Sequence, residues 1–186
     1  MPELQSHLQS GFVIPDGGLA REESRWYAIH TVARHEKRVA QQLGESRVCT
    51  FLPLIEQRRQ WSDRWARVDV PLFTCYAFVR IVQASAERMK VLRVPGVLGF
   101  VGQERCGSPI PDAEIENLQA AMREKLPLAV HPFVSAGKRV RLRGGSLDGV
   151  TGILVGPAGQ SSLIVSVELL RRSVALRVEG YAVELA

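Results

Sequence analysis

Apolar positions along this chain follow two rhythms, and the change from one to the other divides the sequence. Up to residue 124, short strand-like runs alternate with segments whose apolar residues recur at helical spacing. From residue 137 on, short β-rich runs follow one another and are separated by glycine-rich turns. The pattern therefore predicts a mixed α+β domain over residues 25–124 and a small all-β domain over residues 137–186.

The first domain is expected to open with a strand at Arg25, in the run WYAIHT. A helix follows over residues 34–45, because Val39, Ala40 and Leu43 cluster on one side of a helical wheel. On another side, basic and polar residues follow i, i+3, i+4, i+7 spacing: Arg34, Lys37, Arg38 and Gln41. This stripe is either an ordinary solvated face or a surface that follows phosphates, and both interpretations stay open.

The segment after the helix predicts a hairpin. A strand from Cys49 bends at Pro53, and Ser62 and Asp63 are suited to a turn. Basic and aromatic side chains surround that turn: Arg58, Arg59, Arg64, Arg67, Trp61 and Trp65. Such a mixture either grips nucleic acid by stacking and phosphate contact or pairs the tryptophans across the strands against arginine stems, and the sequence favours neither.

The run PLFTCYAFVR, from Pro71 to Arg80, is expected to form one strand. Alternation places Tyr76 and Phe78 on one face, opposite Ala77 and Val79. Three aromatic residues within six positions are dense for a chain that is 6% aromatic. They form either a core strand or a partly exposed docking surface.

A short helix from Ser85, a strand VLGFVG and a helix from Asp112 complete the first domain. In the short helix, Met89 and Leu92 are predicted to be buried. In the last helix the predicted apolar stripe consists of Ile115, Leu118 and Met122. These elements predict a mainly antiparallel sheet with flanking helices.

Outside this domain, residues 1–24 are expected to form a mobile tail and residues 125–136 a linker, because neither segment has a clear period. In the second domain the run KRVRLR alternates, with Val140 and Leu142 inward. Four or five short strands follow one another there, which predicts a small closed β-barrel.

Composition narrows the class of protein. The chain carries 24 Lys and Arg against 19 Asp and Glu, a net charge of +5, which is compatible with a polyanionic partner. It has no apolar run long enough to span a membrane and no secretory signal at its start. Its three cysteines, Cys49, Cys75 and Cys106, form no metal-binding pair, so a cytoplasmic protein without structural metal is expected.

Several segments, taken together, resemble the NusG family of transcription elongation factors. They are WYAIHT with HEKRVAQQL, then PLFTCYAFVR, VPGVLGFVG and GKRVRLRGGSLDGVTGIL. Their order and spacing carry the resemblance. It implies an N-terminal NGN domain, a linker and a C-terminal KOW domain, which is an SH3-like β-barrel. The PLF start and the arginine-rich segment before it are closer to specialised paralogues of the RfaH and UpxY type.

The resemblance implies a protein that binds the clamp helices of the RNA polymerase β′ subunit and suppresses pausing or termination. Helix residues would enter an aromatic pocket. The matching positions are Tyr27, His30, Phe73, Tyr76 and Phe78. Such a factor is expected to be a cytoplasmic monomer that catalyses no reaction and needs no cofactor or metal.

Specialised relatives also read non-template DNA through the first helix, and the matching positions here are Arg34, Lys37, Arg38 and Gln42. We add the hairpin arginines Arg58, Arg59 and Arg64 to this predicted nucleic-acid surface. The KOW domain of the family contacts a small-ribosomal-subunit protein or the termination factor Rho. The corresponding edge here is Leu169, Leu170 and Arg171, where the two leucines could be exposed or belong to the core.

Some positions depart from the family pattern. Thr74 and Cys75 stand where the family commonly has Pro and then Gly or Asn, so the turn before Tyr76 is expected to be shaped differently. In the second domain, Gly149 and Gly152 are in place and suit tight turns or a close backbone approach.

Two other function classes compete with this one. A ribosome-associated or RNA-binding KOW protein would use the arginines of the second domain and lack the polymerase pocket. An enzyme would need Cys49, Cys75 or Cys106 as a nucleophile and a base such as His30, His35 or His131. No motif supplies a third group to orient such a pair, so no enzyme is predicted.

Overall fold

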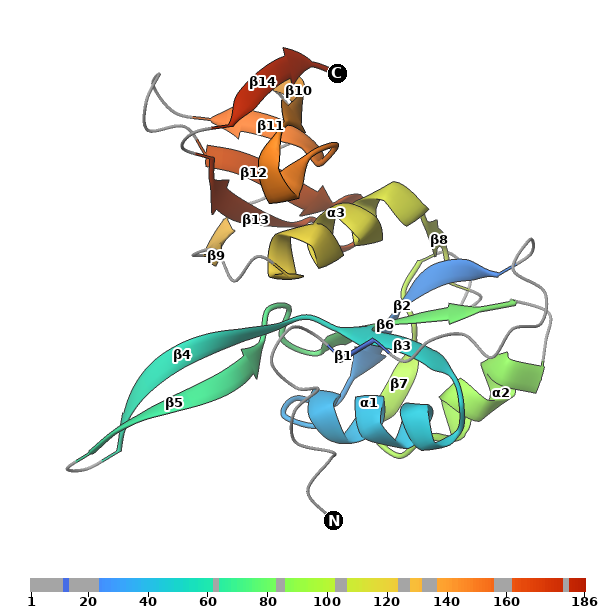
Figure 1. Ribbon diagram of the computed structural model, residues 1–186. Coiled ribbons are helices and arrows are strands. Elements are labelled where there is room, and N and C mark those ends of the chain that lie inside the picture. The colour runs from blue at the N-terminus through green and yellow to red at the C-terminus, as the bar shows by residue number, and fades with distance from the viewer. Residues whose placement is uncertain are drawn as a thin grey trace. The chain divides into compact units, whose positions relative to one another are not determined.

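The computed structural model describes residues 12–13, 24–61, 64–82, 86–102, 107–123, 128–131, 137–155, 162–178 and 181–186. The chain forms two compact units, Met1–Pro109 and Ile110–Ala186 (Figure 1). Of the tail predicted over residues 1–24, Phe12–Val13 forms strand β1, which pairs with β3. None of the described helices has the length and apolar character that crossing a bilayer would require.

The first unit is built on an antiparallel sheet, in which the described strands run in the order β1-β3-β6-β2-β7, and β8 (Pro109–Ile110) also pairs with β2. The bounds of the main strands are β2 (Arg25–Thr31), β3 (Cys49–Leu52), β6 (Tyr76–Ile81) and β7 (Val97–Phe100). In register, Ala28 lies opposite Phe78 and His30 opposite Tyr76. Tyr76 and Phe78 therefore share one face, as the alternation predicted.

Helices α1 (Glu36–Glu45) and α2 (Ala86–Arg93) bury side chains against the other face of this sheet. From α1, Val39, Ala40 and Leu43 enter that core, which confirms the predicted stripe. The prediction for α2 was wrong. Met89 is 49% exposed and Leu92 37%, while Val91 is fully buried, because the short helix lies on the sheet with a different side inward.

The predicted strand from Pro71 to Arg80 is interrupted. Strand β5 (Arg64–Pro71) ends at the proline, a turn follows, and β6 begins at Tyr76. The backbone of Cys75 has φ +67°, a left-handed conformation outside the extended region of regular strands. Strand β4 (Leu54–Trp61) pairs with β5 in a separate two-stranded sheet, as the hairpin prediction required. We call this hairpin the arm; it reaches away from the rest of its unit (Figure 1).

The second unit is a six-stranded antiparallel sheet, counting the described strands, in the order β14-β10-β11-β12-β13-β9. The bounds are β9 (Leu128–His131), β10 (Lys138–Arg143), β11 (Thr151–Val155), β12 (Ser162–Val167), β13 (Arg172–Arg177) and β14 (Ala182–Leu185). Val140 and Leu142 point into its core, as predicted. Short 3-10 turns lie at Gly145–Leu147 and Glu168–Leu170. Strand β9 comes from the segment predicted as a linker and pairs with β13.

Helix α3 (Asp112–Arg123) belongs to the second unit, whereas the sequence placed it at the end of the first domain. Ala121 lies in the core of the C-terminal sheet. Asn117 joins α3 to β11 through two hydrogen bonds with Thr151. Ile115, Leu118 and Met122, the predicted stripe of this helix, are buried as well.

Candidate docking surface and nucleic-acid interface

One face of the first sheet carries a row of aromatic side chains. Phe78 stacks on Phe51 with ring centroids 5.9 Å apart and meets Phe73 edge-on at 6.1 Å. Trp26 meets Phe51 edge-on at 6.4 Å, which extends the row. Contacts of this geometry add stability beyond the area that they bury. The aromatic row, Trp26, Phe51, Phe78 and Phe73, is therefore a rigid part of the unit.

The predicted docking residues do not all reach the surface. Phe73 is 3% exposed and Phe78 is completely buried, so both act as core residues in this structure. Tyr27 is also buried and lies on the opposite face, where its ring meets Phe100 edge-on at 6.0 Å. Burial raises the pKa of the Tyr27 hydroxyl, and the nearby charges of Arg88 and Arg25 oppose that rise.

His30 and Tyr76 remain available. His30 is exposed, Tyr76 is half-buried, and their ring centroids lie 5.3 Å apart on paired strands. Beside them, the pairing of β2 with β7 shifts register at His30 and Thr31, so that Leu98 is an extra residue and 60% exposed. Val32, just beyond β2, is 38% exposed. We call His30, Val32, Tyr76 and Leu98 the docking edge.

Two hydrogen bonds hold the turn that presents Tyr76. The backbone N–H of Thr31 donates to the Cys75 carbonyl at 2.8 Å, and the Cys75 N–H donates to Oε1 of Glu36 at 2.8 Å. Glu36 is 3% exposed and is the first residue of α1. Sequence reasoning missed it, although an acidic residue at the start of an amphipathic helix is a recognisable signal.

The basic face of α1 is solvent-accessible as predicted. Lys37 and Arg38 are exposed on the side of the helix away from Val39 and Leu43. Arg34, predicted to start the helix, is exposed in the turn before α1, with φ +66°. Gln42 is half-buried, and its Oε1 is enclosed without a hydrogen-bond partner among the described residues. The three exposed cations can therefore follow a phosphate chain, whereas Gln42 is less free to do so.

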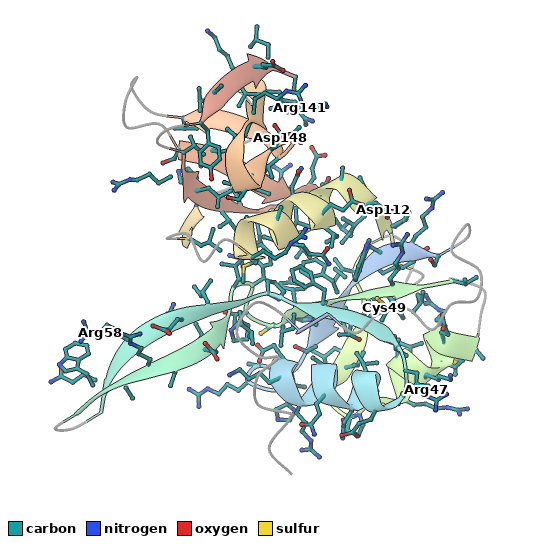
Figure 2. The ribbon with its side chains drawn as sticks, viewed as in Figure 1. Arg47, Cys49, Arg58, Asp112, Arg141 and Asp148 are labelled. Carbon is teal, nitrogen blue, oxygen red and sulfur yellow. The ribbon has the colours of Figure 1, made fainter. Side chains whose placement is uncertain are left out.

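On the arm, the structure describes the side chain of one of the three arginines predicted to bind nucleic acid, Arg58. The Arg58 guanidinium lies over the Trp65 ring, with its carbon 5.6 Å from the ring centroid (Figure 2 labels Arg58). The side chains of Arg59 and Arg64 lie outside the described part of the chain. Trp65 is 62% exposed. The ring therefore packs against an arginine, as one alternative predicted, and it still faces solvent; binding of nucleic acid here stays a prediction.

The predicted partner edge of the second unit is only partly exposed. Leu170 is 9% exposed and Leu169 is half-buried, while Arg171 is exposed and left-handed, with φ +51°. The two leucines are thus not a free apolar pair. The turn that carries them is held from α3, because the Glu168 N–H donates to Oε2 of Glu114 at 3.0 Å.

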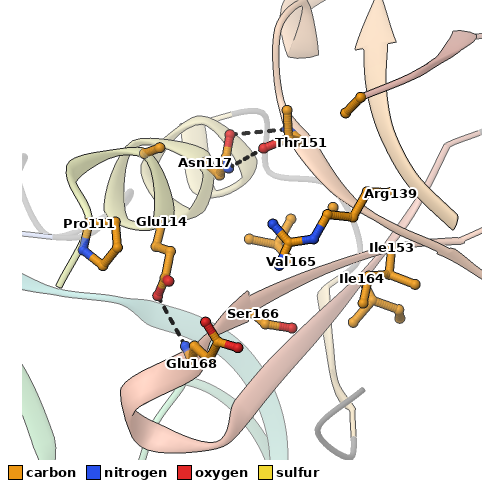
Figure 3. Close-up of a pocket in the computed structure, with 13 residues that line it drawn as sticks. Pro111, Glu114, Asn117, Arg139, Thr151, Ile153, Ile164, Val165, Ser166 and Glu168 are labelled. Carbon is orange, nitrogen blue, oxygen red and sulfur yellow. Dashed lines mark hydrogen bonds between the residues drawn. The ribbon is translucent and has the colours of Figure 1, made fainter. Parts of the chain in front are cut away.

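This contact borders a cavity of about 450 Å³ between α3 and the C-terminal sheet (Figure 3). Glu114, Asn117 and Arg139 line it together with Thr151. Burial is the main reason why the pKa of Glu114 is raised, and the Glu168 N–H and Arg139 partly offset it. Asn117 spans the cavity edge with Nδ2 donating to Thr151 Oγ1 at 2.9 Å and Thr151 N–H donating to Oδ1 at 3.1 Å.

For the enzyme alternative, Cys49 is buried and Cys75 is half-buried, and neither forms a disulfide with another described cysteine, whereas Cys106 lies outside the described residues. Among the described side chains, no group of three or more His, Cys, Asp or Glu gathers as a metal site.

The two glycines expected to serve turns or close approaches do so. Gly149 has φ +85°, and a Cβ on Gly152 would lie 2.5 Å from the Ile164 carbonyl oxygen.

The family-model match and the similar proteins agree on one family. A family model described as transcription termination factor NusG matches residues 24–119, just over half of the chain. Transcription termination/antitermination protein NusG from Staphylococcus carnosus is 27% identical over 176 residues, covering 86% of this chain and 94% of the relative. The Staphylococcus aureus protein of the same name is 28% identical with the same coverage.

Among solved structures, NusG from Thermotoga maritima is 21% identical and matches with a TM-score of 0.48, covering 85% of this chain and 96% of that chain. A likeness at that level does not bear on function. The family-model match does, and the stretch it covers contains the docking edge, the basic face of α1 and the arm.

Proposed function

Because this chain belongs to the NusG family of transcription termination and antitermination factors, we propose that it binds RNA polymerase through the docking edge. The partner would be the pair of clamp helices of the β′ subunit. The position of the Tyr76 side chain is the single observation that carries the proposal. Its ring is half-buried beside the exposed His30 ring, and it is held from behind by a turn bonded to both β2 and α1.

The geometry suits a helix partner. His30 and Tyr76 are paired across β2 and β6, and Leu98 is an exposed apolar residue of the next strand, β7. Together they would offer a short apolar and aromatic strip. An amphipathic helix binds such a strip through side chains spaced three and four residues apart. Phe73 and Phe78 would contribute as the rigid base beneath Tyr76 and not as contact residues, because both are sealed.

Binding of this kind needs no chemistry from the factor. A protein that attaches more tightly to the closed clamp than to the open one shifts the polymerase toward the closed state. Clamp opening accompanies pausing, so the proposed effect is suppression of pausing or termination in the cytoplasm. A monomer suffices for this action.

Two further surfaces would add to it. The exposed cations at the start of α1 and in the turn before it, Arg34, Lys37 and Arg38, would contact non-template DNA near the polymerase. In the second unit, Leu169 and Arg171 would contact the KOW partner, with Leu170 supporting them from the core. That partner is a small-ribosomal-subunit protein or Rho, and a pull-down with each purified protein distinguishes them.

Two alternatives remain predictions. One is specialisation of the RfaH or UpxY type, which the relatives matched above do not test because they carry the name NusG. Mapping the genomic loci that this protein occupies with polymerase would separate a general factor from a specialised one. A KOW protein that lacks a polymerase contact is the other. The family match over residues 24–119 counts against it, because that stretch lies mainly in the first unit.

The test is binding of the full chain to purified core polymerase. Tyr76→Ala should weaken binding about tenfold or more, because truncation of a central aromatic anchor typically costs about 2 kcal/mol, and about 1.4 kcal/mol already corresponds to tenfold. Tyr181→Ala is the matched control, since Tyr181 is also partly buried but lies in the second unit. Unchanged affinity of a His30→Ala, Tyr76→Ala double variant would refute the proposed attachment.

A further inference from the structure

The arm is the one part of the described first unit whose strands pair only with each other. Strands β4 and β5 form a two-stranded sheet through eight paired positions, from Leu54 opposite Pro71 to Trp61 opposite Arg64. An isolated hairpin is marginally stable in water, since it has no second layer to bury its side chains. Apart from Leu54, which belongs to the core of the unit, the described side chains of the arm are half-buried or exposed.

One face of the arm changes character along its length. Directly opposite residues of an antiparallel pair point to the same side, so Glu56 and Asp69 share this face near the base of the arm. Farther out on the same face lie two opposed pairs, which we call the tip face: Arg58 with Arg67, and Gln60 with Trp65. The face is thus acidic near the base and basic and aromatic near the tip.

The tip face is not arranged for the stability of the hairpin. Arg58 and Arg67 stand directly opposite each other, and like charges in that position destabilise a strand pair. Arg67 contacts Glu56, with Nη1 and Oε1 3.4 Å apart, but both side chains are more than half exposed, and such ion pairs contribute little. Arg58 has no carboxylate partner among the described residues, and its contact is the Trp65 ring.

Two guanidinium groups beside an exposed indole match one kind of ligand. Phosphates pair with arginine, and an unpaired nucleobase stacks on an aromatic ring of any kind because every base has a π face. Arg58 lies over the Trp65 ring, and the ring is still 62% exposed, so a base can stack on it. A duplex cannot use this ring without intercalation, because its bases are already stacked on each other.

We propose that the tip face of the arm binds single-stranded nucleic acid, with a base stacked on Trp65 and the phosphates contacting Arg58 and Arg67. This proposal rests on the proposed function, because a factor bound to RNA polymerase lies close to nucleic acid. It adds a ligand contact at Trp65 and Arg67 and makes the recognition tolerant of sequence. The arm would then follow a strand that the polymerase has separated.

The experiment uses the full chain without polymerase and follows the fluorescence anisotropy of a short labelled oligothymidylate at low salt. Trp65→Ala should weaken binding about tenfold, as alanine substitution of a base-stacking aromatic does, and Trp65→Phe should restore most of it. Arg58→Ala with Arg67→Ala should make the salt slope shallower by about 1.4, since each phosphate contact to a single strand contributes about 0.7.

Arg93→Ala is the control for loss of one positive charge, because Arg93 is exposed on α2, outside the arm. It should bind the oligonucleotide as the unchanged protein does. Three outcomes would overturn the inference: Trp65→Ala binding like the unchanged protein, Arg93→Ala losing as much as Arg58→Ala, or the duplex form binding as tightly as the single strand. The result is independent of the Tyr76→Ala polymerase assay, so either proposal can fail alone.

Discussion

The carboxylate of Glu36 accepts a hydrogen bond of 2.8 Å from the backbone N–H of Cys75, across 39 positions of sequence. It ties the first turn of α1 to the turn that precedes Tyr76. Because Glu36 is 3% exposed, the bond is shielded from water. The shape of the docking edge therefore depends on a side chain that does not belong to it.

Removal of this acceptor should destabilise the first unit. Glu36→Ala leaves the Cys75 N–H without a partner in a partly buried site, which costs about 1–3 kcal/mol. Glu36→Gln keeps an acceptor oxygen and should lose less. Denaturant unfolding followed by tryptophan fluorescence reports this, since Trp26 is buried in the same unit. Equal stability of the two variants would show that the bond itself contributes nothing.

Cys75 itself carries a conformational cost. Its φ of +67° is unfavourable for a side chain with a Cβ, and asparagine tolerates this region better than most residues. Cys75→Asn should therefore stabilise the first unit by about 1 kcal/mol or less, and Cys75→Val should destabilise it, because a β-branched residue resists positive φ. The same denaturant assay measures both. If the Cys75→Asn and Cys75→Val variants are equally stable, the left-handed backbone at this position does not limit stability.

That left-handed residue also explains what sequence reasoning could and could not reach. Alternation in β10 and the stripe of α1 are local patterns, and the structure confirms both. The residue pattern alone placed Phe73 and Tyr76 in one strand, because Cys75 is not a turn-forming residue. The family resemblance indicated a turn before Tyr76, and bonds with Thr31 and Glu36 hold it. A local pattern contains no information about such distant partners.

The same limit applies to exposure. Aromatic density in the run from Phe73 to Phe78 identified an unusual surface, but it could not reveal that Phe78 is sealed and Tyr76 half-open. Helix α3 was assigned to the first domain because its periodicity shows that sides are buried, without showing against what. Asn117 of this helix is bonded to Thr151 of β11, and the two positions lie 34 residues apart.

The pair of bonds between Asn117 and Thr151 should be a main attachment of α3 to the C-terminal sheet. Asn117→Ala removes both and should cost about 1–2 kcal/mol, and the Thr151 amide should exchange its hydrogen faster. Glu116→Ala, at an exposed position of the same helix, is the control. Hydrogen exchange at Thr151 that is equally slow in both variants and the unchanged protein would mean that α3 is held elsewhere.

Stability of the second unit should depend on pH through Glu114. Burial raises the pKa of this carboxyl above its ordinary value of 4.5, so its stabilising contribution is complete below that pH and is lost as the pH rises through the raised pKa. Glu114→Gln removes this loss. The variant should be more stable than the unchanged protein at pH 7, by less than about 1 kcal/mol because the site is partly solvated.

The advantage of Glu114→Gln should shrink as the pH falls through the raised pKa and should be absent below 4.5, where the natural side chain is neutral in the folded and the unfolded protein. Thermal unfolding followed by circular dichroism at several pH values measures it. Glu116→Gln provides the matched control on the exposed side of α3. A difference between Glu114→Gln and the unchanged protein that stays constant with pH would assign the effect to packing.

Two glycines of the second unit should respond differently to the same substitution. A Cβ at Gly152 would lie 2.5 Å from the Ile164 carbonyl oxygen and 2.9 Å from Leu163 Cγ, and Ile164 is paired with the neighbouring Ile153. The backbone oxygen can move only if the β11–β12 pairing opens. Gly152→Ala should therefore cost about 3 kcal/mol or more, at the upper end of overpacking.

Gly149→Ala meets no atom within 4 Å, so its cost is the left-handed backbone alone, with φ +85°. That strain amounts to about 1–2 kcal/mol, and the Gly149→Ala variant should remain folded with a modestly lower melting temperature. Circular dichroism melts of the two full-length variants give the comparison. If Gly152→Ala melts as high as Gly149→Ala, strands β11 and β12 can separate slightly without losing their pairing, and the close approach at Gly152 is not what sets the stability of this sheet.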